Sequence, residues 1–125
     1  MIRKAVLDDV NAIHALLQYY HKKGELLARP LHMLYEHLRD FWVFEDPETS
    51  KVTGCGALQF CWENLAEIRS LAVAPEAVGN GIGSALTERC IQEAVYFKIQ
   101  DLFTLTYRPD FFKRFGFDEI DKSDL

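Results

Sequence analysis

The sequence has no hydrophobic run long enough to cross a membrane, and its first residues lack the apolar core of a signal peptide. It has no cluster of basic residues, and its net charge of -5 argues against a nucleic-acid surface. Its three cysteines, Cys55, Cys61 and Cys90, lack the spacing of metal ligands. We therefore expect a cytoplasmic protein with reduced thiols, no metal, and neither nucleic acid nor membrane as a partner.

The composition is that of one folded domain covering residues 1–125, with 49% hydrophobic and 26% charged residues and no internal repeat. Apolar spacing predicts an α/β (α+β) protein: a mixed central sheet of about six strands flanked by about four helices. The aromatic residues of 41–44 and 60–62 are expected to pack in the sheet core. The expected strands are 2–7, 41–45, 52–62, 64–73, 101–107 and 117–120, and the expected helices lie near 10–23, 30–38, 82–97 and 108–116.

The segment "VAPEAVGNGIGSAL", residues 73–86, places glycines at alternate positions just before a helical pattern. The first N–H groups of a helix lack internal partners, and the helix dipole favours an anion there. Glycine permits positive φ and a close approach of phosphate to the backbone. The pattern is neither a Walker loop nor a good dinucleotide fingerprint. It indicates either a phosphate site or only a flexible start to the helix.

This segment resembles the pyrophosphate-binding loop of the GNAT N-acetyltransferase superfamily, whose motif is Arg/Gln-x-x-Gly-x-Gly/Ala. Gly81-Ile82-Gly83 supplies the glycines, but Val78 stands where the motif has Arg or Gln. The element order and "FFKRFGF" also fit. "LAEIRSLAV", "LFTLTY" and "GELLARPLHMLYEHLRDFWV" are most similar to the acetyltransferase domain of short-form N-acetylglutamate synthases. The sequence ends where the family usually adds one more strand, so that strand is either absent, part of a longer chain that continues past Leu125, or supplied by another subunit.

The resemblance implies acetyl-CoA as co-substrate, without a metal. In the family, the strand before the loop separates from its neighbour and leaves backbone N–H groups free for the thioester and pantetheine. Phe112 is expected to pack on the cofactor arm. The expected cofactor-binding residues are Leu71, Ala72, Val73, Val78, Gly79, Asn80, Gly81, Ile82, Gly83, Ser84 and Phe112.

Glu67 is the candidate general base, at a position where some superfamily members carry a catalytic glutamate. It needs a pKa raised toward neutrality by burial; the alternative is an ion pair with Arg69, two residues along the same strand face. Many members carry a general-acid tyrosine where this chain has Phe112. Tyr107 is then the nearest hydroxyl in sequence, with core packing as its alternative role.

Glutamate carries two carboxylates, and arginine binds carboxylates with two parallel hydrogen bonds. Arg29, Arg39 and Arg69 are therefore the candidate substrate-binding residues. The leading hypothesis is acetylation of the α-amino group of L-glutamate, the first step of arginine biosynthesis. Two alternatives stay open: acetylation of another small amine or a protein N-terminus, and a non-catalytic acyl-CoA-binding regulatory module. An unpaired sheet edge after the last strand favours a homodimer.

Overall fold

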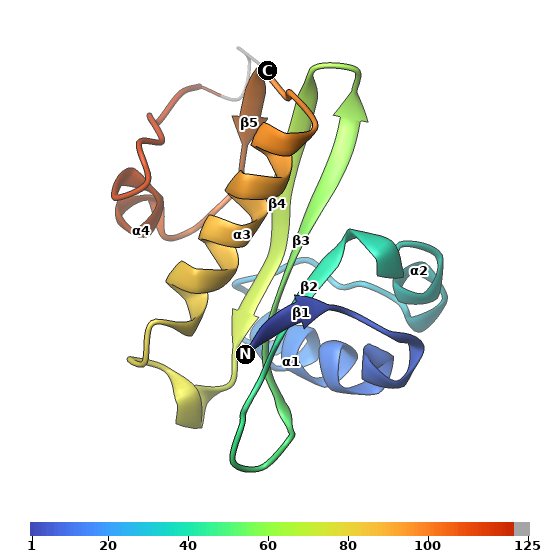
Figure 1. The fold of residues 1–125 in the computed structure, drawn as a ribbon. Helices are drawn as coiled ribbons and strands as arrows, with labels where there is room; N and C mark the ends of the chain where they lie inside the picture. The colour runs from blue at the N-terminus through green and yellow to red at the C-terminus, as the bar shows by residue number, and fades with distance from the viewer. Residues whose placement is uncertain (122–125) are drawn as a thin grey trace.

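The computed structural model describes residues 1–121, and it contains one five-stranded sheet in the order β1-β2-β3-β4-β5 (Figure 1). The first four strands pair antiparallel, and β5 runs parallel to β4. The predicted mixed α/β architecture is confirmed. The strands are β1 (Ile2–Lys4), β2 (Phe41–Glu45), β3 (Val52–Trp62), β4 (Leu65–Val73) and β5 (Asp101–Phe103).

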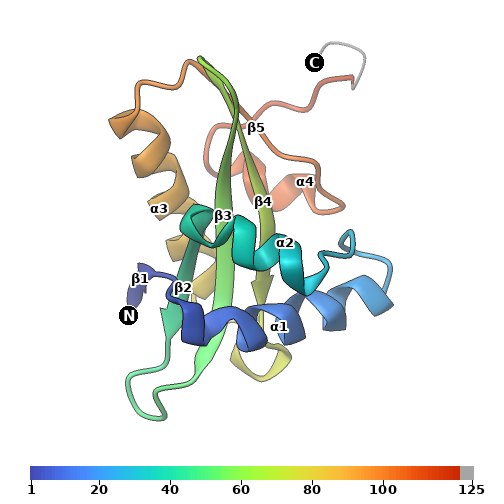
Figure 2. The ribbon, with the colours of Figure 1, turned by 90° about the vertical axis from the view of Figure 1, so that its right-hand side faces the viewer.

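Helices cover both faces of the sheet, with α1 and α2 on one face and α3 and α4 on the other (Figures 1 and 2). Each face has its own buried cluster, because β-strand side chains alternate between faces. The helices are α1 (Val10–Lys22), α2 (Leu31–Glu36), α3 (Ile82–Tyr96) and α4 (Pro109–Lys113), with short 3-10 turns η1 (Leu7–Asp9), η2 (Leu38–Asp40) and η3 (Pro75–Ala77).

The C-terminal part departs from the sequence prediction. The strand expected over 101–107 ends at Phe103, and residues 117–120 form no strand. Only residues 65–67 of β4 pair with β5. Beyond them the Thr104 hydroxyl donates to the Ile68 carbonyl at 2.8 Å, a side-chain bond where a ladder bond was expected. β5 therefore turns away from β4 and opens a gap between them.

Two aromatic residues predicted in the sheet core lie at its surface. Phe60 is 47% exposed and Trp62 is 72% exposed, because β3 continues as part of a long hairpin with β4 past the helices that cover the sheet (Figure 1). Phe60 instead contacts the ring of Phe97 at the end of α3, with ring centroids 5.1 Å apart. The core of the sheet is therefore concentrated in the middle of the long hairpin.

A bulge at Ser70 changes the face to which β4 side chains point. Ser70 has φ 57°, a left-handed conformation, and the β3–β4 register shifts at this point. Before the bulge, Ile68 packs in the cluster beneath α3; after it, Ala72 packs in the cluster beneath α1. Glu67 and Arg69 therefore share the α1 face, whereas Leu71 and Val73 face α3.

The close contact between β3 and α3 depends on a glycine. A Cβ on Gly54 would lie 2.7 Å from Ile82 Cγ2 and 3.0 Å from Leu86 Cδ1. We expect Gly54→Ala to lower the free energy of unfolding by about 1–3 kcal/mol through overpacking, measured by chemical denaturation. Gly83→Ala is the control, since its Cβ meets neighbours only at 3.7 Å and alanine is the better helix former. Equal effects of the two substitutions would contradict this packing.

Candidate active site

The gap between β4 and β5 exposes backbone donors. Ala74 N–H donates to the Thr53 carbonyl at 2.8 Å, so Ala74 directs its N–H toward β3. Alternate residues of an antiparallel ladder direct their N–H groups to opposite edges. Val73 and Leu71 therefore direct theirs toward the gap, where no strand of residues 1–121 pairs with them. The family resemblance implied free N–H groups for a thioester carbonyl on this strand, near Leu71 and Val73.

The glycine loop forms a cradle at the start of α3. Gly79 and Gly81 have φ values of 91° and 78°, which explains why glycine is needed there. Ala85 is the first residue of α3 whose N–H is bonded, to the Gly81 carbonyl at 3.0 Å. The N–H groups of residues 79–84 have no acceptor within the described part of the chain. Such a set of free donors at a helix N-terminus fits a diphosphate.

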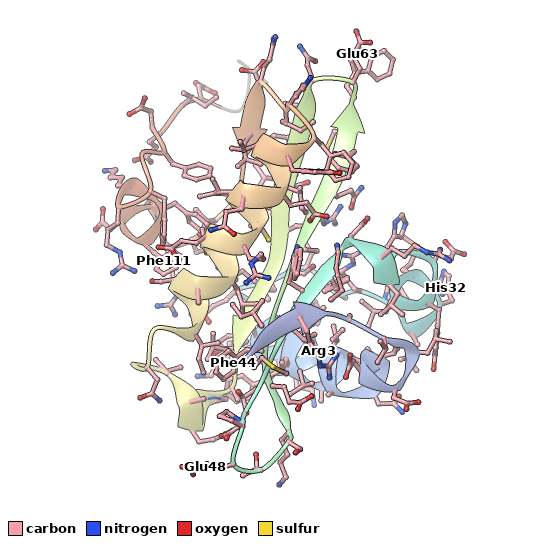
Figure 3. All side chains as sticks on the ribbon, in the orientation of Figure 1. Arg3, His32, Phe44, Glu48, Glu63 and Phe111 are labelled. Carbon is pink, nitrogen blue, oxygen red and sulfur yellow. The ribbon has the colours of Figure 1, made fainter. Side chains whose placement is uncertain are left out.

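The loop and the open edge of β4 line one cleft of about 500 Å³. The far wall comes from α4, where Phe111 points toward α3 (Figure 3). Its ring would contact a Cβ on Gly83 at 3.7 Å, so the ring lies directly over the loop. The cleft therefore joins a phosphate cradle to the free N–H groups of β4, which suits a long phosphorylated thioester such as acetyl-CoA.

A second cavity of about 780 Å³ adjoins this cleft. It contains Glu67, Arg69 and Arg29, and both cavities share Ser70 and Tyr107. Both cavities are lined by Arg69 as well, whereas Glu67 lines only the second cavity and Leu71, Ala72 and Val73 line only the cofactor cleft.

Glu67 lies in this second cavity with its carboxylate largely buried. Burial raises the pKa of the Glu67 carboxyl above its ordinary value, and the charges of Arg69 and Arg29 oppose this only in part. Its ion pair with Arg69 Nη1 is long, at 3.9 Å, because that nitrogen donates to Gln59 Oε1 at 2.7 Å. The structure therefore leaves Glu67 able to exchange a proton with a bound molecule.

Arg29 is the most unusual charge in the protein. It is only 7% exposed, and burial together with the charge of Arg69 lowers the pKa of its guanidinium. Its contacts are the Ser70 hydroxyl at 3.0 Å and the face of Phe41 at 5.2 Å. No carboxylate of residues 1–121 lies within ion-pair distance of it. A buried charge without an ion-pair partner is unfavourable, and the more distant charges of Asp40 and Glu67 offset this only in part, so an anion bound in this cavity would stabilise Arg29.

The other predicted site residues are placed as follows. Arg39 is exposed and lines neither cavity, so the structure does not bring it to the other two arginines. Tyr107 is 78% exposed and lines both cavities, so the alternative of core packing is wrong.

Val78 lines the cleft, but its N–H points at the Pro75 carbonyl, 3.5 Å away. Asn80 does not line the cleft; its side chain donates to the Ala77 carbonyl.

Sequence reasoning missed two cleft residues at α4, Phe111 within the helix and Arg114 just after its end. Phe112, expected on the cofactor arm, does line the cleft, but it is 5% exposed and packs in the core beneath α3, whereas Phe111 presents its ring to the loop. Arg114 stacks on Phe111 and donates to the Ser84 hydroxyl. Spacing could have found Arg114, because it follows Phe111 by three residues and so lies beside it on a helical turn.

No helix within residues 1–121 has the length and apolar character to cross a bilayer. Within the same residues, no group of three or more histidines, cysteines or carboxylates could hold a metal ion.

Comparison with known proteins agrees with this geometry. The family model for the acetyltransferase (GNAT) domain matches residues 36–119. The amino-acid acetyltransferase of Mycobacterium tuberculosis is 44% identical, over 97% of this chain and 70% of its own length. A crystal structure of a Mycobacterium tuberculosis protein in complex with CoA and NLQ has TM-score 0.93 and 44% identity, over 97% of this chain and 73% of that one.

N-acetylglutamate synthase from Neisseria gonorrhoeae, crystallised with coenzyme A and N-acetyl-glutamate, also has TM-score 0.93. It is 31% identical, and the match covers 100% of this chain but 30% of that one. The expected co-substrate is confirmed, since these related proteins bind CoA in structures that superpose on nearly the whole chain. The chain therefore belongs to the GNAT acetyltransferase family, and it is an acetyl-CoA-dependent N-acetyltransferase.

Proposed function

We propose that the chain transfers the acetyl group of acetyl-CoA to the α-amino group of L-glutamate, the first step of arginine biosynthesis. The observation that carries this proposal is the buried, unpaired guanidinium of Arg29 in the same cavity as Glu67 and Arg69. Relatives named amino-acid acetyltransferase support an amino-acid acceptor. The N-acetyl-glutamate bound to the Neisseria gonorrhoeae enzyme supports glutamate as that acceptor.

The two arginines recognise the acceptor. A dicarboxylic amino acid offers two anionic groups, and Arg29 and Arg69 offer two guanidinium groups on adjoining elements. Arg29 is held by Ser70 and Phe41, and Arg69 by Gln59, so both are positioned before the acceptor binds. Preorganisation of this kind reduces the entropy lost on binding.

Glu67 prepares the nucleophile. An amino acid arrives as an ammonium ion, which cannot attack a carbonyl carbon until it loses a proton. The raised pKa of Glu67 makes its carboxylate a stronger base than an exposed one, so it accepts this proton directly or through a water molecule. Acetyl-CoA supplies the activated acyl carbon, and the N–H groups of Leu71 and Val73 donate to its carbonyl oxygen.

The leaving thiolate needs little assistance. An ordinary thiol has a pKa near 8.5, so the sulfur can leave as an anion. Tyr107 lies where the two cavities meet, and its hydroxyl is the group that we propose as proton donor to the sulfur.

The test is a thiol-release assay with acetyl-CoA and a panel of acceptors: glutamate, glutamine, aspartate, a polyamine and a peptide N-terminus. We expect turnover with glutamate to exceed that with the uncharged and cationic acceptors. Turnover with another amine but none with glutamate would remove the substrate assignment. Binding of acetyl-CoA without turnover of any acceptor would favour the regulatory module instead.

We also propose that the protein is a homodimer in the cytoplasm. The support for self-association is the outer edge of β5, which no strand of residues 1–121 covers. Light scattering should give twice the chain mass at micromolar concentration. A monomer under those conditions would count against the dimer.

A further inference from the structure

The phosphate cradle at the start of α3 contains no cation of its own. Residues 78–84 read Val-Gly-Asn-Gly-Ile-Gly-Ser, so the loop offers backbone N–H groups and one hydroxyl but no basic side chain. A diphosphate carries at least two negative charges into this cleft. Backbone donors and the helix dipole balance only part of that charge, so a nearby cation would strengthen binding.

Three arginines line the cofactor cleft, and two of them are engaged elsewhere. Arg69 donates to Gln59 at 2.7 Å and lies beside Glu67. Arg108 pairs with Glu25 at 2.8 Å. Arg114 is the third, and no carboxylate of residues 1–121 lies within ion-pair distance of it.

Arg114 is directed at the cradle by specific contacts. Its guanidinium lies 4.8 Å from the centroid of Phe111 and 5.9 Å from that of Phe115. Its Nη2 donates to Ser84 Oγ at 3.2 Å, and its Nε to the Phe111 carbonyl at 3.5 Å. Ser84 belongs to the first turn of α3, whose N–H groups are free. The charge is thus held at the edge of the cradle, in reach of an anion bound there.

We propose that Arg114 is a diphosphate-binding residue of the cofactor cleft and supplies, from the C-terminal end of α4, the positive charge that residues 78–84 lack. Its contact with Ser84 joins the two helices that enclose the diphosphate. The inference rests on acetyl-CoA as co-substrate and does not depend on which acceptor is used. CoA also carries a 3′-phosphate, and the position of Arg114 beside the helix N-terminus favours the diphosphate.

The test is calorimetric titration of Arg114→Gln with three ligands: CoA, 3′-dephospho-CoA and acetyl-pantetheine. Loss of one charge-assisted contact at an exposed site should weaken CoA binding about tenfold. We expect the same loss with 3′-dephospho-CoA and none with acetyl-pantetheine, which has no phosphate. A loss seen with CoA but absent with 3′-dephospho-CoA would assign Arg114 to the 3′-phosphate and overturn the proposal.

Two further variants separate this role from general charge and folding effects. Lys113→Gln makes the same charge change on α4, but Lys113 lies near Asp110 and Glu119 and does not line the cofactor cleft; its CoA affinity should stay within twofold. Val78→Arg, placed in the Arg114→Gln background, should restore most of the affinity, since the Val78 side chain is exposed in the same cleft.

Equal weakening by Arg114→Gln and Lys113→Gln would show a non-specific charge effect and overturn the proposal. Failure of the unaltered protein to acetylate glutamate would remove the acceptor assignment and leave this result intact. The two proposals can therefore fail independently.

Discussion

Replacing Glu67 with glutamine is expected to lower kcat/KM for the amino-acid acceptor roughly 10²–10⁴-fold, the usual contribution of a general base. The amide has nearly the same shape but cannot accept the ammonium proton. Affinity for CoA should not change, because Glu67 lies in the adjoining cavity and not in the cofactor cleft. Steady-state kinetics and calorimetry together measure both quantities.

The pH profile gives a second readout for Glu67. Only the carboxylate form accepts a proton, so activity should rise with pH through the Glu67 pKa, which burial places above the ordinary carboxyl value. The glutamine variant should lose this acidic limb. Glu63→Gln, at the exposed tip of the β3–β4 hairpin (Figure 3), is the matched control and should keep the profile. An unchanged profile in Glu67→Gln would falsify the assignment of the base.

Replacing Arg29 with methionine is expected to have opposite effects on acceptor binding and on folding. A buried charge pair of this kind is worth about 2–5 kcal/mol, so the acceptor KM should rise roughly 30-fold or more. The unfolding midpoint should stay the same or increase, because methionine fills the same space without burying an unpaired charge. Few substitutions weaken substrate binding while they leave the stability of the fold unchanged or higher.

Arg39→Met is the comparison for Arg29. Arg39 is exposed and outside both cavities, so its loss should leave the acceptor KM and the unfolding midpoint unchanged. Kinetics and thermal unfolding of the two variants, made side by side, test the anion role of Arg29. A large drop in the midpoint of Arg29→Met, with an unaltered KM, would make Arg29 a structural residue.

Local patterns were sufficient to predict most of the elements. The long hairpin follows from two apolar runs separated by a short polar turn. Its strands, 52–62 and 65–73, lie within one residue of the expected 52–62 and 64–73. The cradle follows from glycine spacing before a helix, and Gly79 and Gly81 do adopt positive φ. Both features depend on short stretches of chain, where residue type and backbone conformation are directly linked.

Features that depend on distant contacts could not be predicted. Residues 104–107 have the composition of a strand but do not pair with β4, because the Thr104 hydroxyl donates a hydrogen bond to the Ile68 carbonyl. The burial of Arg29 depends on Ser70 and Phe41, which are remote in sequence. The exposure of Trp62 depends on how far α3 extends along the hairpin. No short stretch of sequence indicates any of these three features, because each depends on contacts that form only in the folded chain.

The bulge at Ser70 limits which parts of such a protein can change when its acceptor changes. One continuous strand presents Glu67, the proposed base, on one side of the bulge and the N–H groups of Leu71 and Val73, the proposed carbonyl donors, on the other, at a fixed offset. An insertion or deletion in β4 would displace the carboxylate and the N–H groups relative to each other, so the length of this strand is constrained. A change of acceptor is therefore expected to require changes in the loops 24–30 and 104–108, which line the two cavities without belonging to β4.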